Sequence, residues 1–192
     1  METYIRQIDL KEFETLHKEC ILRDFPLPEV RPYKDFLRLD RDKRLLINGL
    51  FRESERLLYA SYLFSENRRC CMLDYFAVEP QFRGQGYGSL YLQMIREELL
   101  KNKELRAMII EIESPAMAED AVEQEKRIKR RDFYLKNGAV ATNLHSFVYD
   151  VDFDLLYIPL SGNYTEEELA SDYRKIYEHA LSHNFSGHFF MN

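Results

Sequence analysis

The sequence lacks a hydrophobic run of the length that crosses a membrane, and its first residues do not match a secretory leader. Hydrophobic residues make up 45% of the 192 residues, yet no apolar stretch approaches the ~20 residues of a membrane span. Acidic residues interrupt the N-terminal segment METYIRQIDLKEFE, and no apolar core follows it. We therefore expect a cytoplasmic protein that does not bind membranes.

The sequence also has few cysteines, and its net charge is negative. The three cysteines are odd in number, and the adjacent pair Cys70 and Cys71 would point to opposite faces of a strand, so we expect reduced thiols rather than a disulfide. The formal net charge of −6 argues against a nucleic-acid binder and slightly favours a cationic substrate.

Several motifs of common enzyme classes are missing. There is no P-loop, because no pair of glycines with four residues between them precedes Lys-Ser/Thr. There is also no dinucleotide fingerprint, because Ser89 stands where the third glycine is required. His179 and His183 are four residues apart on an expected helix, but the segment HALSH has no glutamate, so we expect no metal site. No repeat or low-complexity linker divides the chain, and we expect one domain over residues 1–192.

What the sequence does have is a glycine-rich turn between an expected strand and an expected helix, within residues 73–98. Gly84, Gly86 and Gly88 alternate there, so the backbone can approach a ligand closely. The first N–H groups of the following helix have no partner within the helix and carry the positive end of its dipole, and Arg83 adds a formal charge. This pattern predicts a site for a phosphate or pyrophosphate; the alternative is a tight turn without a ligand.

The spacing Arg83-x-x-Gly86-x-Gly88 resembles the acyl-coenzyme-A-binding motif of the GCN5-related N-acetyltransferase (GNAT) superfamily. The resemblance implies an α/β (α+β) fold with a mixed, mostly antiparallel central sheet, one splayed pair of parallel strands and flanking helices. It covers residues 69–140, and it implies acetyl-CoA as cosubstrate. The same resemblance implies three sets of coenzyme contacts. The backbone of Phe76, Ala77 and Val78 would pair with the pantetheine arm, and Gln85, Gly86, Tyr87, Gly88 and Ser89 would hold the pyrophosphate. Arg83 and Gly84, which precede them, are also coenzyme contacts.

A second stretch, RRDFYLKNGAV at residues 130–140, resembles the downstream motif of the same family. The resemblance implies that Tyr134 protonates the departing coenzyme thiolate; the alternative is a core aromatic residue. The family often has an asparagine seven residues before this tyrosine, where this chain has Arg127. That coenzyme contact is therefore in doubt.

The general base is a separate question, because the acceptor amine is protonated at neutral pH. Met72 stands where the histone-modifying branch has its glutamate, so that mechanism is not supported. Asp74 is a second candidate that could equally be structural. We place the role at Glu113, near the open end of its strand, acting directly or through water; the alternative is that ordered waters alone remove the proton.

The flanking regions contain clear helix signals. Asp9 with Glu12 and Thr165 with Glu168 form capping-box patterns, and the helix after the glycine turn should bury Leu90, Tyr91, Met94, Ile95 and Leu99. Residues 161–192 are an additional helical extension. Its aromatic residues Phe185, Phe189 and Phe190, together with exposed edge strands, would fit a homodimer.

Together these patterns predict an N-acetyltransferase that moves an acetyl group from acetyl-CoA to a primary amine by direct attack. The acceptor is a small-molecule amine or a peptide amine, and the sequence does not choose between them. The alternative is an acyl-CoA-binding domain that has lost turnover.

Overall fold

The computed structural model describes residues 2–148, 150–181 and 189–191. The chain forms two compact units, one from residues 1–64 and 73–99 and the other from residues 65–72 and 100–192. The described residues have a mixed α/β fold whose strands are mostly antiparallel, with helices flanking them and a C-terminal helix, as the sequence predicted. The expectation of one domain over residues 1–192 stays a prediction.

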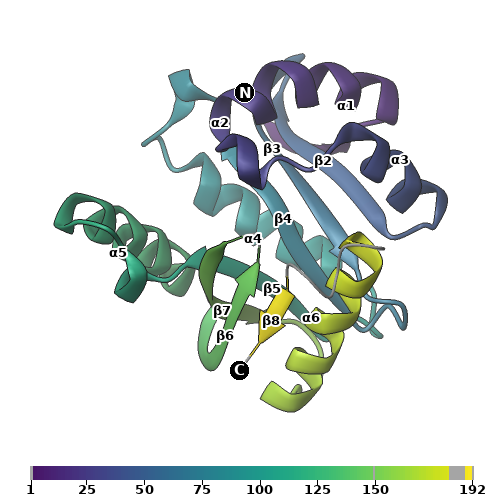
Figure 1. Cartoon of the computed structure of the whole chain (residues 1–192). Helices are drawn as coiled ribbons and strands as arrows, with labels where there is room; N and C mark the ends of the chain where they lie inside the picture. The colour runs from purple at the N-terminus through teal and green to yellow at the C-terminus, as the bar shows by residue number, and fades with distance from the viewer. Residues whose placement is uncertain (1, 149, 182–188, 192) are drawn as a thin grey trace. The chain divides into compact units, whose positions relative to one another are not determined.

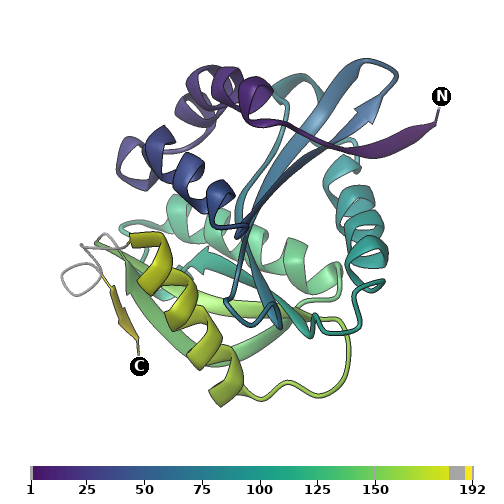
Figure 2. The same ribbon diagram turned by 90° about the vertical axis from the view of Figure 1, so that its right-hand side faces the viewer.

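The first unit is a four-stranded sheet with helices on both faces. Its strand order is β1-β2-β3-β4, with β1 and β3 both antiparallel to β2. Helices α1–α3 lie over one face of these strands (Figure 1), and α4 lies over the opposite face (Figure 2). The strands are β1 (Thr3–Gln7), β2 (Leu45–Arg52), β3 (Glu55–Phe64) and β4 (Cys70–Val78), the last of which enters this unit at Leu73; the helices are α1 (Leu10–Leu16), α2 (Leu22–Asp24), α3 (Tyr33–Arg41) and α4 (Tyr87–Leu99), with short 3₁₀ turns at Leu27–Glu29 and Pro80–Phe82.

The first helical run begins as the capping pattern predicted and then departs from it. The Asp9 side chain accepts a hydrogen bond from the Glu12 backbone N–H at 2.8 Å. Between α1 and α2, however, His17–Ile21 form a π-helical turn, which the apolar spacing did not indicate. Because each residue of a helix turns it by about 100°, the extra residue of a π turn changes the direction of every later side chain, including Asp24.

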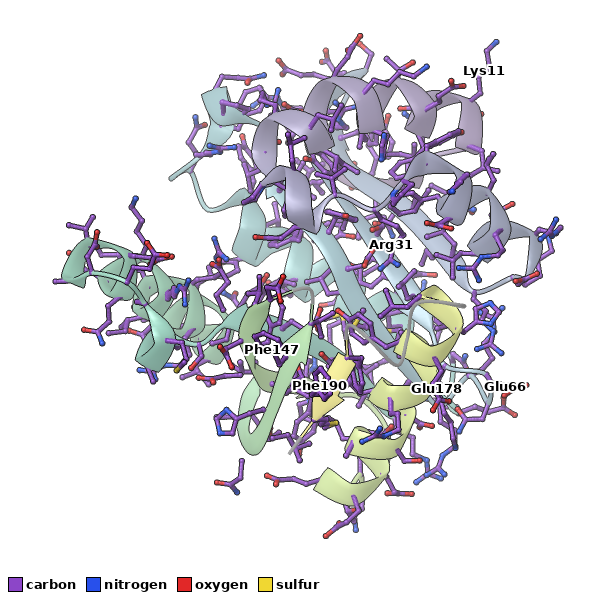
Figure 3. The ribbon with its side chains drawn as sticks, in the orientation of Figure 1. Lys11, Arg31, Glu66, Phe147, Glu178 and Phe190 are labelled. Carbon is purple, nitrogen blue, oxygen red and sulfur yellow. The ribbon has the colours of Figure 1, made fainter. Side chains whose placement is uncertain are left out.

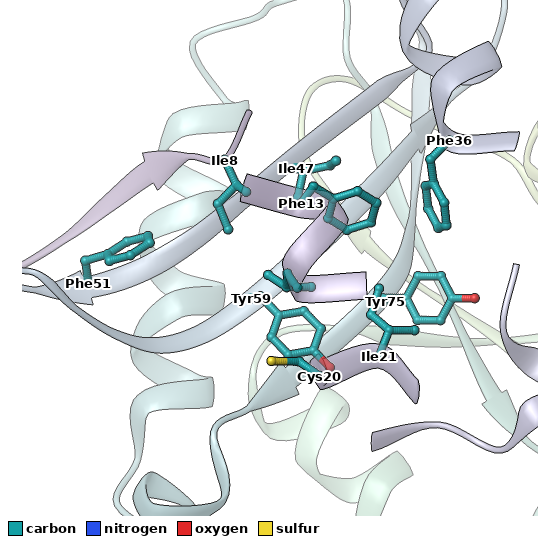
Figure 4. Packing of buried hydrophobic residues seen from close by; sticks show 10 residues of the cluster. Ile8, Phe13, Cys20, Ile21, Phe36, Ile47, Phe51, Tyr59 and Tyr75 are labelled. Carbon is teal, nitrogen blue, oxygen red and sulfur yellow. The ribbon is translucent and has the colours of Figure 1, made fainter. Parts of the chain in front are cut away.

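The hydrophobic core of the first unit lies between its sheet and the helices α1–α3 (Figure 4). Phe13 from α1 packs edge-on against Phe36 from α3, with ring centroids 4.8 Å apart, and both side chains are fully buried. Tyr59 of β3 and Tyr75 of β4 extend the cluster along the strands. These aromatic contacts fix the helices on the sheet.

Helix α4 buries a slightly different face from the predicted one. Tyr91, Ile95 and Leu99 are buried as expected, but Leu90 and Met94 are only half-buried, and Leu92 is fully buried instead. Leu90 and Leu92 flank Tyr91 almost symmetrically on the helix surface. The sequence period therefore does not choose between them, and the packing against β1 and β3 does.

The second unit has a sheet in the order β5-β7-β6-β8, in which each of these neighbours is antiparallel. The start of β4, Cys70–Met72, belongs to this unit and runs parallel to β5, and the Arg106 N–H donates to the Arg69 carbonyl at 2.7 Å. The strands are β5 (Ala107–Glu113), β6 (Val140–Val148), β7 (Val151–Pro159) and β8 (Phe189–Met191); the helices are α5 (Ala121–Lys136) and α6 (Glu166–Leu181), with a 3₁₀ turn at Pro115–Met117.

Helix α6 is the predicted C-terminal helix. Thr165 and Glu168 exchange reciprocal hydrogen bonds at its start, which confirms the capping box. Its apolar face is entirely buried: Leu169, Tyr173, Ile176, Tyr177, Ala180 and Leu181. Strand β8 was not predicted, because three residues are too few to show an alternating pattern.

The aromatic residues of the C-terminal segment divide between core and surface. Phe189 is 4% exposed and packs against Tyr173 and Tyr177 of α6, so it belongs to the core rather than to a free surface. Phe190 is 57% exposed and lies beside Phe147 of β6 (Figure 3). Phe185 lies outside the described residues, and a homodimer stays a prediction.

One glycine in the first sheet allows a testable prediction about packing. A Cβ atom at Gly49 of β2 would lie 2.7 Å from the Leu58 carbonyl oxygen of β3, which is rigid backbone. We expect Gly49→Ala to lower the free energy of unfolding by about 1–3 kcal/mol, measured by urea denaturation. Lys11→Ala, at an exposed position of α1, is the control and should change it by less than ~0.5 kcal/mol. A Gly49→Ala protein as stable as the wild type would contradict this account of the sheet.

Candidate functional site

The turn between β4 and α4 contains two glycines in the left-handed backbone conformation. Gly84 has φ +75° and Gly86 has φ +85°, and a Cβ atom at either position would meet nothing within 4 Å. Glycine is therefore required here by backbone conformation and not by crowding. Gly88 differs from them, because it is buried in the first turn of α4. The turn thus needs glycine at 84 and 86 whether or not a ligand binds.

The start of α4 presents free backbone donors next to this turn. The first α-helical hydrogen bond runs from the Leu90 N–H to the Gly86 carbonyl, at 3.0 Å. The N–H groups of Tyr87, Gly88 and Ser89 therefore precede the first donor of the helix and have no acceptor within it. Gly84, Gln85 and Gly86 are exposed. An anion at this end of the helix would meet both these amides and the positive end of the dipole.

Arg83 lies beside the turn and is held by two groups. Its Nε donates to the Val78 carbonyl at 3.1 Å, and its Nη2 donates to the Asp24 carboxylate at 2.8 Å. The side chain is still 56% exposed. The predicted charge is therefore present at the turn, but it is shared with an acidic residue from the end of α2.

Arg83 contacts one buried carboxylate, Asp24, and Arg23 links Asp24 to a second, Glu79; the sequence predicted neither role. The Asp24 side chain is 4% exposed and that of Glu79 is 8% exposed. Glu79 accepts hydrogen bonds from Arg56 at 2.7 Å and from Arg23 at 3.0 Å. These residues come from three separate segments, α2, β3 and the turn after β4, so no spacing in the sequence could have indicated the cluster.

Asp24 is ionised in this surrounding. Burial acts to raise the pKa of its carboxyl, but hydrogen bonds from Arg23 and Tyr59 and the nearby charge of Arg83 outweigh burial and hold the pKa below its usual value. Asp24 in turn raises the pKa of the Tyr59 phenol, whose burial is the larger cause.

The end of β4, where pantetheine contacts are predicted, is supported from the side of α4. Phe76, Ala77 and Val78 are half-buried, and the Phe76 ring stacks on Tyr91 with centroids 5.6 Å apart. The Tyr91 hydroxyl bonds to Tyr62 at 2.7 Å and donates to the Asn48 side chain. This buried network fixes the position of the strand end.

Asp74, an alternative candidate for the base, has a structural role. Its carboxylate accepts hydrogen bonds from Arg31 at 3.0 Å and from Ser61 at 3.3 Å, and the side chain is 7% exposed. Arg31 is labelled in Figure 3. This buried ion pair joins Arg31, which follows the 3₁₀ turn at Leu27–Glu29, to β4.

In the second unit, Glu113 at the end of β5 is ion-paired with α5. It lies 2.9 Å from Arg130 and 3.8 Å from Arg127, and its side chain is 21% exposed. Arg127 also donates to the Ser114 carbonyl at 2.8 Å and to Glu123 at 2.6 Å. The arginine at the position of the family asparagine thus ties α5 to the end of β5.

Tyr134 lies on α5, one turn after Arg130. It is 8% exposed, and burial raises the pKa of its phenol to about 12, against a smaller opposing effect of Arg130. Its backbone carbonyl accepts from the N–H groups of Asn137 and Ala139, where Gly138 ends the helix at φ +89°. The phenol is therefore protonated throughout the neutral range.

Glu111 lies two residues before Glu113 and faces α6. It accepts hydrogen bonds from the hydroxyl groups of Tyr177, at 2.7 Å, and Tyr173. Burial and the negative charge of Glu111 raise the pKa of the Tyr173 phenol well above its usual value. This carboxylate serves to anchor α6 on the sheet.

Within the described part of the chain, no group of three or more His, Cys, Asp or Glu side chains is arranged to hold a metal ion. Of the two histidines at helical spacing, His179 lies on α6 and His183 is outside the described residues. The three cysteines are buried free thiols. Among the described helices, none is both long and apolar enough to cross a membrane.

Comparison with known proteins agrees with this geometry. The sequence profile of the Acetyltransferase (GNAT) family matches residues 6–122, which is more than half of the chain and includes the glycine turn and Glu113. The chain therefore belongs to the GNAT family of acetyltransferases. Tyr134 lies beyond the matched range. A search of the curated proteins found no match.

Solved structures show the same fold at low sequence identity. A GNAT-family putative acetyltransferase from Bacteroides thetaiotaomicron is 21% identical, with a TM-score of 0.66 over 88% of this chain and 92% of that one. The ribosomal-protein-S18-alanine N-acetyltransferase from Escherichia coli is 17% identical, with a TM-score of 0.61 over 86% and 98%. The spermidine N-acetyltransferase from Vibrio cholerae, in complex with CoA and spermine, is 11% identical, with a TM-score of 0.58 over 82% and 95%.

The glycine turn leads to a prediction that needs no ligand. Because Gly84 and Gly86 are in the left-handed conformation without nearby atoms, we expect Gly86→Ala to destabilise the protein by strain alone, by about 1–2 kcal/mol. Gly86→Asn should be milder, because asparagine tolerates this conformation better. Equilibrium unfolding in urea measures both. An asparagine variant that is less stable than the alanine variant would show that side-chain bulk, and not backbone strain, is responsible.

Proposed function

We propose that this protein is an N-acetyltransferase that transfers the acetyl group of acetyl-CoA to a primary amine. The observation that carries the proposal is the start of α4, where the amides of Tyr87, Gly88 and Ser89 precede the first helical donor and the exposed turn before them begins at the half-exposed Arg83. The chain's membership of an acetyltransferase family makes coenzyme A the natural anion for this site.

The pyrophosphate of the coenzyme would bind at Gln85–Ser89, where backbone donors and the helix dipole favour negative charge. Arg83 adds a charged donor. The backbone of Phe76–Val78 would pair with the pantetheine arm as an additional strand would, with the Phe76 amide at the thioester carbonyl, where it would stabilise the oxyanion. The network under Phe76 supports this role, because a donor that is already held in place needs no reorganisation.

The reaction also needs a donor for the departing thiolate and an acceptor for the amine proton. Tyr134 is protonated at neutral pH, so its phenol can donate a hydrogen bond and then its proton as the C–S bond breaks. We assign proton removal from the amine to Glu113, directly or through water. Arg130 pairs with Oε2 of Glu113, and the other carboxylate oxygen, Oε1, lies 3.8 Å from Arg127.

The acceptor class is taken from chemistry and from the structural neighbours. One neighbour is a spermidine N-acetyltransferase and another acts on the alanine of a ribosomal protein, so polyamines and peptide N-termini are the first acceptors to test. The net charge of −6 favours cationic acceptors.

The coenzyme site can be tested by calorimetric titration of acetyl-CoA. We expect micromolar binding by the wild type, about −8 kcal/mol, and loss of measurable binding for Arg83→Glu and for Gly86→Asp, which place negative charge at the anion site. Lys11→Glu is the control matched to Arg83→Glu, because it makes the same change of net charge at an exposed position of α1, and it should bind like the wild type. A folded wild type that does not bind acetyl-CoA would overturn the proposal.

The catalytic role of Tyr134 can be tested by a thiol-release assay over a panel of amines. We expect Tyr134→Phe to lower kcat by about 10²-fold or more while acetyl-CoA affinity stays unchanged, because the hydroxyl is needed only when the thiolate leaves. With a phenol pKa of about 12, loss of the tyrosine proton should not reduce the wild-type rate at pH values up to 10. Tyr157→Phe, on β7, is the control.

Two results would separate the alternatives. Unchanged kcat in Tyr134→Phe would remove this tyrosine from the mechanism while leaving the enzyme assignment intact. Acetyl-CoA binding without thiol release for any amine would instead indicate a coenzyme-binding domain without turnover.

A further inference from the structure

Arg83 and Asp24 form an unequal pair. The Arg83 side chain is 56% exposed, whereas that of Asp24 is 4% exposed. Arg83 uses one donor on the Val78 carbonyl and another on Asp24 Oδ1, out of the five N–H donors of a guanidinium. Its remaining donors lie on a half-exposed group next to the glycine turn.

Asp24 does not depend on Arg83 for its position. Arg23 donates to both of its carboxylate oxygens, at 3.0 Å to Oδ1 and 2.6 Å to Oδ2, and the Tyr59 hydroxyl donates to Oδ2 at 2.9 Å. The carboxylate is thus neutralised and fixed by neighbours on α2 and β3. Arg83 is an additional partner, attached to an anchor that is already rigid.

We propose that Asp24 is a positioning residue for the coenzyme: it holds the Arg83 guanidinium at the glycine turn, so that the charge is already in place when a pyrophosphate arrives. The inference rests on the proposed function, since it needs an anion at this turn. A long exposed arginine otherwise samples many rotamers and loses that freedom when it binds. The bonds to Asp24 and Val78 restrict this freedom before binding.

A positioning role for Asp24 and simple charge repulsion predict opposite changes in coenzyme affinity when the charge of Asp24 is removed. Asp24 is negatively charged beside a site for an anion, so removing its charge would strengthen coenzyme binding if charge repulsion were its main effect. If Asp24 acts by holding Arg83, removing the charge must weaken binding. The direction of the change therefore decides between the two.

The experiment is a double-mutant cycle on acetyl-CoA affinity, measured by calorimetry with Asp24→Asn, Arg83→Gln and the double variant. We expect Asp24→Asn to weaken binding about threefold to tenfold, from the lost restriction of one long side chain. In the Arg83→Gln background the same substitution should have no effect within about twofold, because Asp24 acts through Arg83. A substitution that merely damaged the fold would weaken binding in both backgrounds.

Two further variants keep the test decisive. Arg83→Lys keeps the charge at an exposed position but cannot bond both Val78 and Asp24 as a guanidinium does, so we expect it to lose most of what Arg83→Gln loses. The comparison of Arg83→Lys with Arg83→Gln tests the positioning role even if Asp24→Asn does not fold. Tyr59→Phe removes a hydrogen bond from Asp24 Oδ2 but leaves the Arg83 contact at Oδ1, and it should bind like the wild type.

The results separate the inference from the function on which it rests. Absence of binding by the wild type would refute the proposed coenzyme site itself. If the wild type binds acetyl-CoA, either of two results would refute the positioning role alone. One is that Asp24→Asn binds as tightly as the wild type or more tightly, and the other is that Arg83→Lys binds as tightly as the wild type.

Discussion

The first unit depends on the neutralisation of two buried carboxylates, Asp24 and Glu79. They lie where α2, β3 and the turn after β4 meet, and three arginines from different segments surround them. A carboxylate of this cluster that lost all its arginine partners would be a buried charge without compensation, which is far more destabilising than loss of an exposed ion pair. The glycine turn is therefore attached to a rigid base, although its own residues are exposed.

This arrangement separates stability from binding. The left-handed conformation of Gly84 and Gly86 and the bond from Arg83 to Val78 shape the turn, while the amides at the start of α4 remain available. A backbone site of this kind needs few specific side chains. The solved structures that share this fold are only 11–21% identical to the chain.

The second unit uses its acidic strand residues differently. Glu111 anchors the tyrosines of α6, and Glu113 pairs with α5 one turn before Tyr134. The two carboxylates are two residues apart on one strand, yet one holds a helix through neutral phenols and the other through guanidinium groups. Their environments, and not their positions in the sequence, set what each can do chemically.

The sequence alone determined features that depend on neighbours along the chain: the strand, glycine turn and helix in that order, the capping boxes at Asp9 and Thr165, and the motif that places the chain in its family. These features arise from local backbone geometry and hydrogen bonds, which a short stretch of residues can specify. Only the tertiary structure decided the π-helical turn at His17–Ile21, the choice of Leu92 over Leu90, the strand β8 and the Asp24 and Glu79 cluster. Each of these depends on contacts between segments far apart in sequence, which no local pattern records.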